Sequence, residues 1–233
     1  MNNKMGGDLK KIQVVGKYLV EIWRALGMDM TKVEFLSASE EINKNPGEYW
    51  TLVMDVARKS NLKRIVRCSQ IMGRNDTDDL SAAQIFYPCM QAADIFYLKA
   101  DICQLGLDQR KVNMLAREYA DQCKPKRRKP VILSHPMLPG LLQGQEKMSK
   151  SDPNSAIFME DTEQEVKTKI KKAFCPPGEE EGNPCLAYLR HIVMPWSGSF
   201  VVERKEDNGG DREYTDYETL AADYTSGALH PAD

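Results

Sequence analysis

"KADICQLGLDQRKVNMLAREYADQCKPKRRKPVILSHPML", residues 99–138, is the stretch that decides the fold of this chain. Residues 99–106 are predicted to form a strand that leaves on a glycine turn, and residues 130–138 a second, buried strand. Between them, residues 108–123 have the apolar spacing of a helix, with Asp108 near its start. Strands alternating with helices indicate an α/β fold with a largely parallel sheet.

Helical spacing also dominates the residues before this stretch. Helices are predicted over residues 8–27, with Gly27 as the glycine after the last turn, and over 45–61. Residues 78–98 form a third predicted helix, in which Ser81 and Gln84 have the spacing of a capping box and Pro88 lies in the first turns or bends the helix. A short strand is predicted over residues 32–39.

The character of the sequence changes near residue 160. Thr162 and Glu165 again have capping-box spacing, and the rest appears helical, with loops or turns over 175–184 and 203–213. We therefore expect two domains, 1–160 and 161–233.

Composition restricts the class of protein. The chain has 233 residues, of which 42% are hydrophobic and 28% charged, and no apolar run approaches the roughly 20 residues of a membrane span. It begins without the apolar segment of a signal peptide, and its six cysteines contain no C-x-x-C pair. Reduced thiols are favoured over disulfides or a zinc site, and the expected location is the cytoplasm.

The net charge of −2 gives no overall electrostatic signal for nucleic acid. Two local basic runs stand out, at 123–130 and 167–172. Taken alone, each run is read as solvated surface, the first as a loop and the second as a helix face.

The polar stretch 141–155, "LLQGQEKMSKSDPNS", holds the first candidate site. Lys147 and Lys150 are point charges on long stems, and Ser149 and Ser151 are neutral donors, so the four could hold the pyrophosphate of a nucleotide. Composition alone leaves a solvated surface loop as the alternative.

A second candidate lies on the predicted helix 78–98. Tyr87, Gln91 and Asp94 are spaced four and three apart and share one face. A phenol, an amide and a carboxylate in line are unusual for packing and suit a polar small molecule. The alternative is a helix with a partly solvated face.

The third candidate is "LGLDQRK", residues 105–111, directly after a predicted strand. Gly106 would let a ligand approach the backbone, Asp108 could accept from ribose hydroxyls, and Gln109 could reach the ligand held by Gln91. Open α/β sheets bind ligands at the carboxyl ends of their strands, where these residues would lie.

Four motifs together carry a family resemblance: "YPCMQAAD", "LGLDQRK", "HPMLPGL" and "EKMSKSDP". They resemble the catalytic domain of tyrosyl-tRNA synthetases of the archaeal and eukaryotic cytosolic type. Downstream, "KIKKAFCPP", "GNPCLAYLRHIVMPW" and "ADYTSGALHPAD" resemble the helical anticodon-binding domain of the same family. Tryptophanyl-tRNA synthetases share a KMSKS-type loop but not the Y-x-x-x-Q-x-x-D pattern followed by G-x-D-Q-R-K.

The resemblance implies a fold and a reaction. The fold would be the C-terminal part of a Rossmann-like class I catalytic domain with parallel strands, followed by an α-helical anticodon-binding domain. The reaction would be ATP-dependent activation of tyrosine to tyrosyl-adenylate and its transfer to tRNA(Tyr). Magnesium would arrive with ATP as part of the substrate, with no metal site and no tightly bound cofactor in the protein.

The resemblance also implies roles for residues at matching positions. Tyr87, Gln91 and Gln109 would hold the ammonium group of tyrosine, and Asp94 would lie at its phenol. Gly106 and Asp108 would bind ribose, and the backbone around Met137 and Leu138 would meet adenine. The charge of the departing pyrophosphate would be stabilised by the loop residues Lys147, Ser149, Lys150 and Ser151. Four residues would contact tRNA: Arg110 and Lys111 at the acceptor stem, and His230 and Asp233 at the first anticodon base.

The sequence departs from the family pattern in three places. It contains no H-x-G-H-like motif, it stops before the family's last long helix, and Asn208 stands where the family usually has an aromatic residue. We therefore expect a fragment that is inactive alone, although the longer parent would be active. The stacking partner of the anticodon base is either another residue or has been lost.

Two functions are open to this chain. The first is the ligase, working as a homodimer or pseudo-dimer as the family does. The second is a non-catalytic module that binds tRNA or pairs with another synthetase-like chain.

Overall fold

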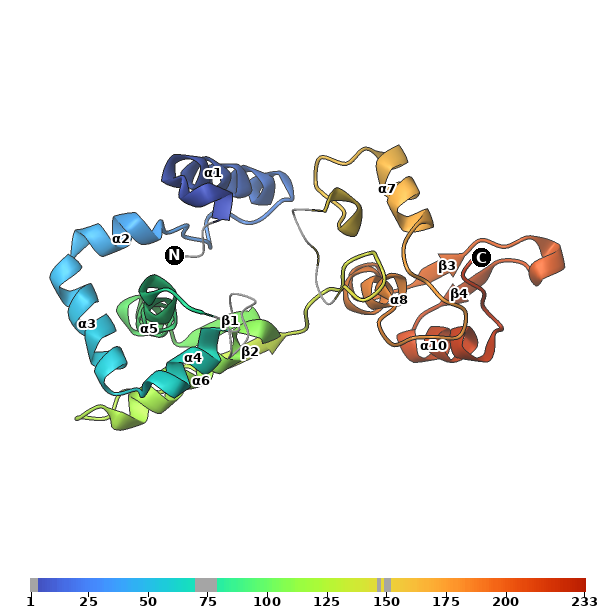
Figure 1. Ribbon diagram of the computed structural model, residues 1–233. Helices are drawn as coiled ribbons and strands as arrows, with labels where there is room; N and C mark the ends of the chain where they lie inside the picture. The colour runs from blue at the N-terminus through green and yellow to red at the C-terminus, as the bar shows by residue number, and fades with distance from the viewer. Residues whose placement is uncertain (1–3, 70–78, 146–147, 149–151) are drawn as a thin grey trace. The chain divides into compact units, whose positions relative to one another are not determined.

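The computed structural model describes residues 4–69, 79–145, 148 and 152–233. The chain divides into two compact units, Met1–Pro136 and Met137–Asp233 (Figure 1). Among the described residues, no helix is both long and apolar enough to cross a bilayer.

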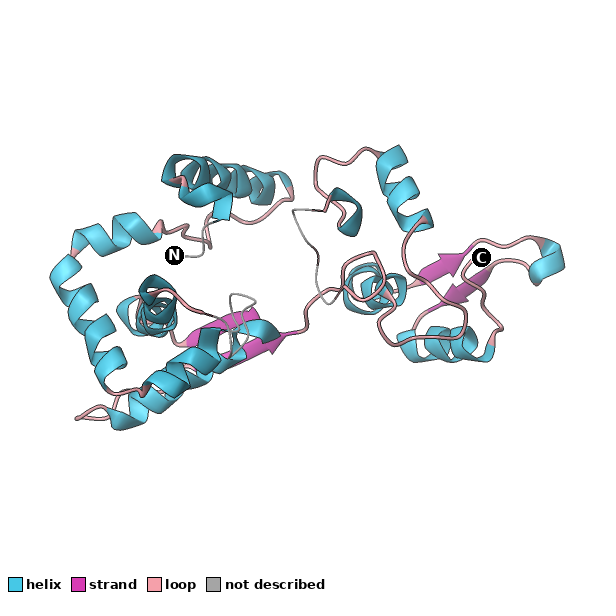
Figure 2. Cartoon of the chain, in the orientation of Figure 1, coloured by secondary structure: helices cyan, strands magenta, loops and turns pink. Residues whose placement is uncertain are grey.

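The first unit is mainly helical, with one pair of strands in its described part (Figure 2). In chain order its elements are η1 (Lys4–Gly7), α1 (Leu9–Ala25), α2 (Ala38–Lys44), α3 (Pro46–Arg58), α4 (Leu62–Cys68), α5 (Ala82–Tyr97), β1 (Ile102–Gly106), η3 (Leu107–Gln109), α6 (Arg110–Gln122) and β2 (Val131–His135).

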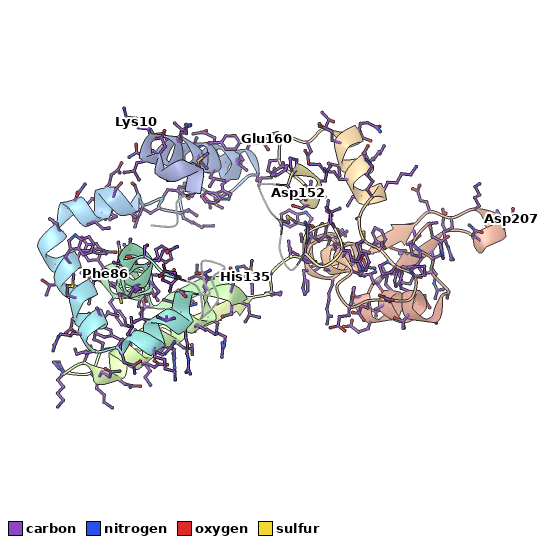
Figure 3. All side chains as sticks on the ribbon, in the orientation of Figure 1. Lys10, Phe86, His135, Asp152, Glu160 and Asp207 are labelled. Atoms are coloured by element: carbon purple, nitrogen blue, oxygen red, sulfur yellow. The ribbon has the colours of Figure 1, made fainter. Side chains whose placement is uncertain are left out.

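The β1–α6–β2 segment confirms the strand–helix–strand prediction. β1 and β2 pair in parallel, from Ile102 opposite Val131 to Gly106 opposite His135, the residue that ends β2 (Figure 3). The carboxyl ends of both strands therefore lie at the same edge of the sheet, where η3 follows β1.

The strand predicted over residues 130–138 is present as β2, but the prediction that it is buried was wrong. Burial alternates along β2, with Val131 50% and Leu133 49% exposed, and Ile102 opposite Val131 is 59% exposed. The thiol of Cys103, which points to the other face of β1, donates to Asn113 of α6 at 3.7 Å. Within the described residues, α6 therefore covers one face of the strand pair and leaves an apolar face exposed.

The strand predicted over residues 32–39 is also absent. The backbone there is irregular until α2 begins at Ala38. Alternating residues form a strand only where another backbone supplies ladder hydrogen bonds, and no described strand pairs with this segment. Phe35 instead stacks on Trp23 with ring centroids 5.1 Å apart.

The other helix predictions in this unit were confirmed within a few residues. α1 ends at Ala25 and Gly27 takes a positive φ of 81°, as the predicted glycine after the helix requires. Ser81 and Gln84 form the capping box of α5, and Pro88 lies in its second turn. Helices α2 and α4 were not predicted.

The core of the first unit lies between its helices. α3 packs on α5, which packs on α4 and α6. Ala92 and Ala93 of α5 are fully buried, and their small side chains let the neighbouring helices pack closely against α5. Larger side chains that are fully buried there include Val53, Val56, Leu115 and Tyr119.

The second unit contains η4 (Pro153–Ser155), α7 (Glu163–Lys171), α8 (Pro184–Tyr188), the π-helical turn η5 (Leu189–Val193), α9 (Met194–Ser197), β3 (Phe200–Val202), η6 (Glu206–Asn208), β4 (Arg212–Tyr214) and α10 (Tyr217–Ser226). The antiparallel pair β3–β4 was not predicted. The connection between the two strands, residues 203–211, lies within the loop or turn expected over 203–213, whose last two residues belong to β4.

The two compact units divide at Pro136, before the boundary near residue 160 that the sequence suggested. Hydrogen bonds explain this difference. The amide of Leu141 donates to Ser155 at 2.9 Å, and its carbonyl accepts from Phe174 at 2.7 Å. Residues 137–160 are thereby joined to the segment that follows. The division into functional domains 1–160 and 161–233 stays a prediction.

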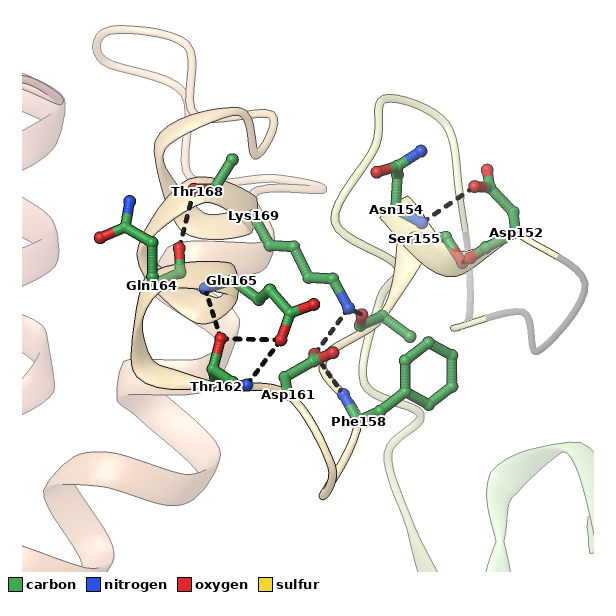
Figure 4. Close-up of polar contacts among 11 residues, drawn as sticks. Asp152, Asn154, Ser155, Phe158, Asp161, Thr162, Gln164, Glu165, Thr168 and Lys169 are labelled. Atoms are coloured by element: carbon green, nitrogen blue, oxygen red, sulfur yellow. Dashed lines mark hydrogen bonds and ion pairs between the residues drawn. The ribbon is translucent and has the colours of Figure 1, made fainter.

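A capping box begins α7, as predicted (Figure 4). The hydroxyl of Thr162 accepts from the Glu165 amide at 3.3 Å, and the Glu165 carboxylate accepts from the Thr162 amide at 2.7 Å. The capping box therefore satisfies two amides at the helix start that would otherwise be unpaired. Beside it, Lys169 donates to Asp161 at 2.6 Å, and this hydrogen bond lowers the pKa of Asp161.

Replacing Thr162 with alanine is expected to lower the free energy of unfolding by about 1 kcal/mol, because an amide at the start of α7 loses its side-chain acceptor. Urea denaturation followed by circular dichroism measures the change. Thr162→Ser keeps the hydroxyl and should retain nearly all of the stability. Equal stability of the alanine variant and the parent chain would contradict this role.

Candidate functional site

Helix α5 presents the three polar residues predicted to bind a ligand. Tyr87, Gln91 and Asp94 are each half-buried, whereas Cys89 and Ala93 on the same helix are buried in the core. Burial raises the pKa of the Tyr87 phenol, and the charge of Asp94 raises it further. Both residues belong to α5 and are seven positions apart, so they lie on the same face of the helix, as their spacing predicted.

The Asp94 carboxylate is held from a neighbouring helix. Tyr49 of α3 is 1% exposed, and its hydroxyl donates to Asp94 at 2.8 Å. Burial raises the pKa of Asp94, while the hydrogen bond from Tyr49 lowers it. Tyr49 occupies one acceptor position of the carboxylate, and an ionised carboxylate has about four.

The residues after β1 meet the same helix face. Gln91 Nε2 donates to Gln109 Oε1 at 3.0 Å. Gln109 ends the turn η3 that follows β1, so the strand end fixes its position. The two glutamines were predicted to reach one ligand, and the structure brings them into direct contact.

Gly106 and Asp108 lie at the carboxyl end of β1, as predicted, but the glycine does not form the expected turn. Its φ of −59° and ψ of 157° are open to any residue, so the backbone conformation does not require glycine there. The chain turns instead in the next three residues, Leu107–Gln109. Asp108 is half-buried in this turn.

The predicted tRNA contacts lie on both units. Arg110 and Lys111 begin α6 and are exposed, and the Lys111 carbonyl accepts from Arg64 at 3.1 Å. In the second unit, the Asp233 carboxylate accepts from the His230 amide at 2.9 Å and pairs with Arg204 at 3.7 Å. The Asp233 side chain is only 11% exposed, and the ion pair and the hydrogen bond hold it in place.

The remaining predicted residues belong to the second unit. Met137 is 37% exposed and Leu138 is half-buried. Asn208 is exposed at the end of η6, between β3 and β4. The candidate phosphate-binding residues lie outside the described residues: Lys147, Ser149, Lys150 and Ser151.

Comparison with known proteins identifies the family. The whole chain, residues 1–233, matches the family described as tRNA synthetases class I (W and Y). It is 68% identical over 233 residues to tyrosine–tRNA ligase 1, cytoplasmic, of Arabidopsis thaliana, and 40% identical over 250 residues to a tyrosine–tRNA ligase of Saccharolobus islandicus. The chain belongs to the tyrosyl-tRNA synthetase family. The resemblance inferred from the four motifs is thereby confirmed.

A solved structure of the family agrees with the fold. Tyrosyl-tRNA synthetase from Pyrococcus horikoshii, complexed with L-tyrosine, superposes with a TM-score of 0.89 at 37% identity, covering 100% of this chain and 70% of that one. This supports the class I tyrosyl-tRNA synthetase fold with its parallel sheet. The chain spans 60% of the Arabidopsis relative and 68% of the archaeal one.

Sequence reasoning missed Tyr49 as a neighbour of the candidate site. It lies 45 residues before Asp94 in an amphipathic helix and looks like an ordinary core aromatic. A buried tyrosine needs a hydrogen-bond partner for its hydroxyl. This requirement was the one indication in the sequence that Tyr49 contacts a polar residue. Nothing in the sequence alone indicates which acceptor it finds.

Proposed function

We propose that this chain takes part in the ATP-dependent activation of tyrosine to tyrosyl-adenylate and in the transfer of the tyrosyl group to tRNA(Tyr) in the cytoplasm. The observation that carries the proposal is that polar side chains of α5 and of η3 lie together and are linked by a hydrogen bond. There the Gln91–Gln109 hydrogen bond of 3.0 Å lies one helical turn from the Asp94 carboxylate. The names of the relatives support the same function.

The ammonium group of tyrosine needs three acceptors. Tyr87 can offer its phenol oxygen, Gln91 its Oε1, and Gln109 the second lone pair of its Oε1. Gln91 Nε2 already donates to Gln109, which turns the Gln91 oxygen away from its neighbour and leaves it for the ligand.

The phenol of tyrosine would donate to Asp94. Tyr49 holds this carboxylate in position through one oxygen, and the remaining lone pairs can accept a second phenol. Phenylalanine would leave the half-buried carboxylate without that partner, at a cost of about 1–3 kcal/mol or more for a charged group. Asp94 therefore sets the preference for tyrosine.

Adenylate formation joins a tyrosine carboxylate oxygen to the α-phosphorus of ATP and releases magnesium pyrophosphate. This step depends mainly on positioning and charge stabilisation. Gly106 and Asp108 would bind ribose, and Met137 and Leu138 would bind adenine. The ammonium groups of Lys147 and Lys150, aided by Ser149 and Ser151, would stabilise the leaving pyrophosphate.

The tRNA would be bound at its two ends. Arg110 and Lys111 are exposed cations at the start of α6 and suit the acceptor stem. His230 and Asp233 would contact the first anticodon base, and the second unit would serve as the anticodon-binding domain.

Tyrosine-dependent exchange of pyrophosphate into ATP tests the proposal. It is measured on the 233-residue chain and on a form lengthened at its amino end. Exchange by either form supports the ligase. Silence of both would contradict it and favour the alternative, a non-catalytic module that binds tRNA or pairs with another synthetase chain. The proposed homodimer or pseudo-dimer is checked by sedimentation.

Replacing Tyr49 with phenylalanine is expected to weaken tyrosine binding by about 5- to 10-fold, because Asp94 loses the hydroxyl that orients it, a hydrogen bond to a charged group. The pKa of Asp94 should rise in this variant, since the hydrogen bond now lowers it. Tyrosine binding as a function of pH measures both effects. Tyr97→Phe, which removes a hydroxyl that donates to the Glu41 carbonyl, is the matched control. Tyrosine binding that is unchanged in both variants would mean that Tyr49 is not part of the site.

A further inference from the structure

Two neighbouring helices and one loop of the first unit carry an excess of positive charge. Together α4, α6 and the loop 123–130 hold eleven lysines and arginines and two acidic residues, a net charge of +9. The whole chain has a net charge of −2, so the remaining residues are acidic in sum. Positive charge that gathers on one part of an otherwise acidic chain is typical of a protein that binds a polyanion.

An ion pair joins the two helices. α4 lies against α6 (Figure 1), and Arg64 of α4 pairs with Glu118 of α6 at 2.9 Å. Arg64 also donates to the Lys111 carbonyl at 3.1 Å. Lys63 and Arg67 are exposed and four residues apart, so they share the outward side of α4, next to Arg64. The cations of α4 and of the first turns of α6 therefore belong to one surface.

Both acidic residues of this surface are neutralised by ion pairs. Glu118 is paired with Arg64, and Asp121, three residues further along α6, pairs with Lys129 of the loop at 2.5 Å. Glu118 and Asp121 share the outward side of α6, so the second ion pair holds the loop beside that side. The surface is therefore continuous from α4 across α6 to the loop.

The loop is held in a fixed shape. Cys123 and Pro130, at its two ends, are buried. In its middle, the Arg127 amide donates to the Ala120 carbonyl at 3.2 Å. Five exposed cations lie between the ends: Lys124, Lys126, Arg127, Arg128 and Lys129. Because the loop is folded against α6, it offers a shaped surface and not an extended peptide, which favours a phosphate backbone over a peptide-binding protein as the partner.

Several cations of this surface are available to a ligand. Arg128 pairs with Asp101 at 2.9 Å. Lys63, Arg67 and Lys124 are exposed and form an ion pair with none of the described carboxylates. Each cation that neutralises a phosphate releases a counterion from the RNA and makes binding sensitive to salt. Since α6 has 13 residues and is about 20 Å long, the surface can follow several phosphates of one strand.

We propose that α4, α6 and the loop 123–130 form a phosphate-binding surface for the acceptor arm of a tRNA. The identity of this RNA rests on the proposed function, because charge by itself specifies only a polyanion. Arg110 and Lys111, at the start of α6, would contact the end of the acceptor stem, and the cations of α4 and of the loop would hold the backbone beyond it. Contacts of this kind position an RNA without reading its sequence.

The test measures binding of a hairpin RNA with the acceptor stem of tRNA(Tyr) to the 233-residue chain, by fluorescence anisotropy at several salt concentrations. The hairpin has no anticodon, so anticodon contacts do not contribute. The double variants Lys124→Ala/Lys126→Ala and Lys63→Ala/Arg67→Ala should each bind about tenfold more weakly at about 0.1 M salt, and the slope of log K against log salt should become shallower by about 2. A hairpin of unrelated sequence should lose as much.

Lys10→Ala/Lys11→Ala is the matched control, because these two lysines are exposed at the start of α1, outside the proposed surface. An equal loss in this control would mean that net charge and not this surface attracts the RNA. Hairpin binding that is unchanged in both double variants would overturn the proposal and leave the surface to a protein partner. The unsubstituted chain gives a measurement that needs no variant, since a salt slope shallower than about −2 would mean too few phosphate contacts.

The outcomes separate this inference from the proposed ligase. Pyrophosphate exchange by a chain that does not bind the hairpin would overturn the phosphate-binding surface alone. Hairpin binding that depends on the loop and on α4, in a chain without exchange activity in either form, would support the surface and contradict the ligase. Thermal melts of the double variants, whose substituted side chains are all exposed, confirm that they fold.

Discussion

Replacing Asp94 with alanine is expected to lower tyrosine affinity by about 10- to 100-fold and to remove most of the preference for tyrosine over phenylalanine. In the proposed site the wild-type carboxylate would accept from the ligand phenol, a hydrogen bond to a charged group worth about 1.5–3 kcal/mol. The variant gives the phenol no acceptor and also leaves the 1%-exposed Tyr49 without its partner. Phenylalanine makes no such bond, so its binding should change little.

The measurement is pyrophosphate exchange driven by tyrosine and by phenylalanine, in the form of the chain that supports exchange. Asp101→Ala provides a matched control, because this carboxylate is exposed and pairs with Arg128 on the surface. A cooperative thermal melt of the Asp94 variant confirms that it folds. An undiminished preference for tyrosine in a folded Asp94→Ala variant would mean that the phenol is bound elsewhere.

The sequence predicted those parts of the fold and site that depend on local spacing. The capping boxes at Ser81 and Thr162 join residues three apart, and the β1–α6–β2 unit follows from two short apolar runs around a helix. The α5 face was predictable for the same reason, since a period of 3.6 residues fixes which side chains share a face. Gln91 and Gln109 could be assigned to one ligand because the sequence indicated both the helix face that carries the first and the strand end that carries the second. In the structure their side chains are in contact.

The features that escaped prediction depend on contacts between distant residues. Tyr49 finds Asp94 across 45 residues, and no local pattern encodes that partner. The strands β3 and β4 have three residues each, too few for alternation to be visible. The predicted strand at 32–39 failed for the opposite reason, since its alternation was present but no described strand pairs with it.

The largest expected effect on stability is that of Tyr119→Ala, which should lower the free energy of unfolding by about 3–5 kcal/mol, as for a large buried aromatic. Tyr119 is 1% exposed, and its ring meets Phe96 edge to face at 5.3 Å. The ammonium group of Lys59 lies 5.1 Å from the same ring. The alanine variant would leave a cavity where α6 packs on α5, and urea denaturation measures the loss.

Tyr119→Phe separates the ring from its hydroxyl, which donates to Asp55 at 2.7 Å. This variant should lose about 1–2 kcal/mol of the free energy of unfolding.

Burial raises the pKa of Asp55, but hydrogen bonds from Lys59, Tyr119 and Arg58 outweigh it and bring the value to about 2. Because that pKa lies below the usual value of about 3.9, the stabilisation is complete above pH ~4 and is lost as the pH falls toward 2. The gap in stability between the phenylalanine variant and the parent chain should narrow over that interval, while most of the alanine variant's deficit persists. A gap that stays constant down to pH 2 would mean that the hydroxyl stabilises the fold without its bond to the Asp55 carboxylate.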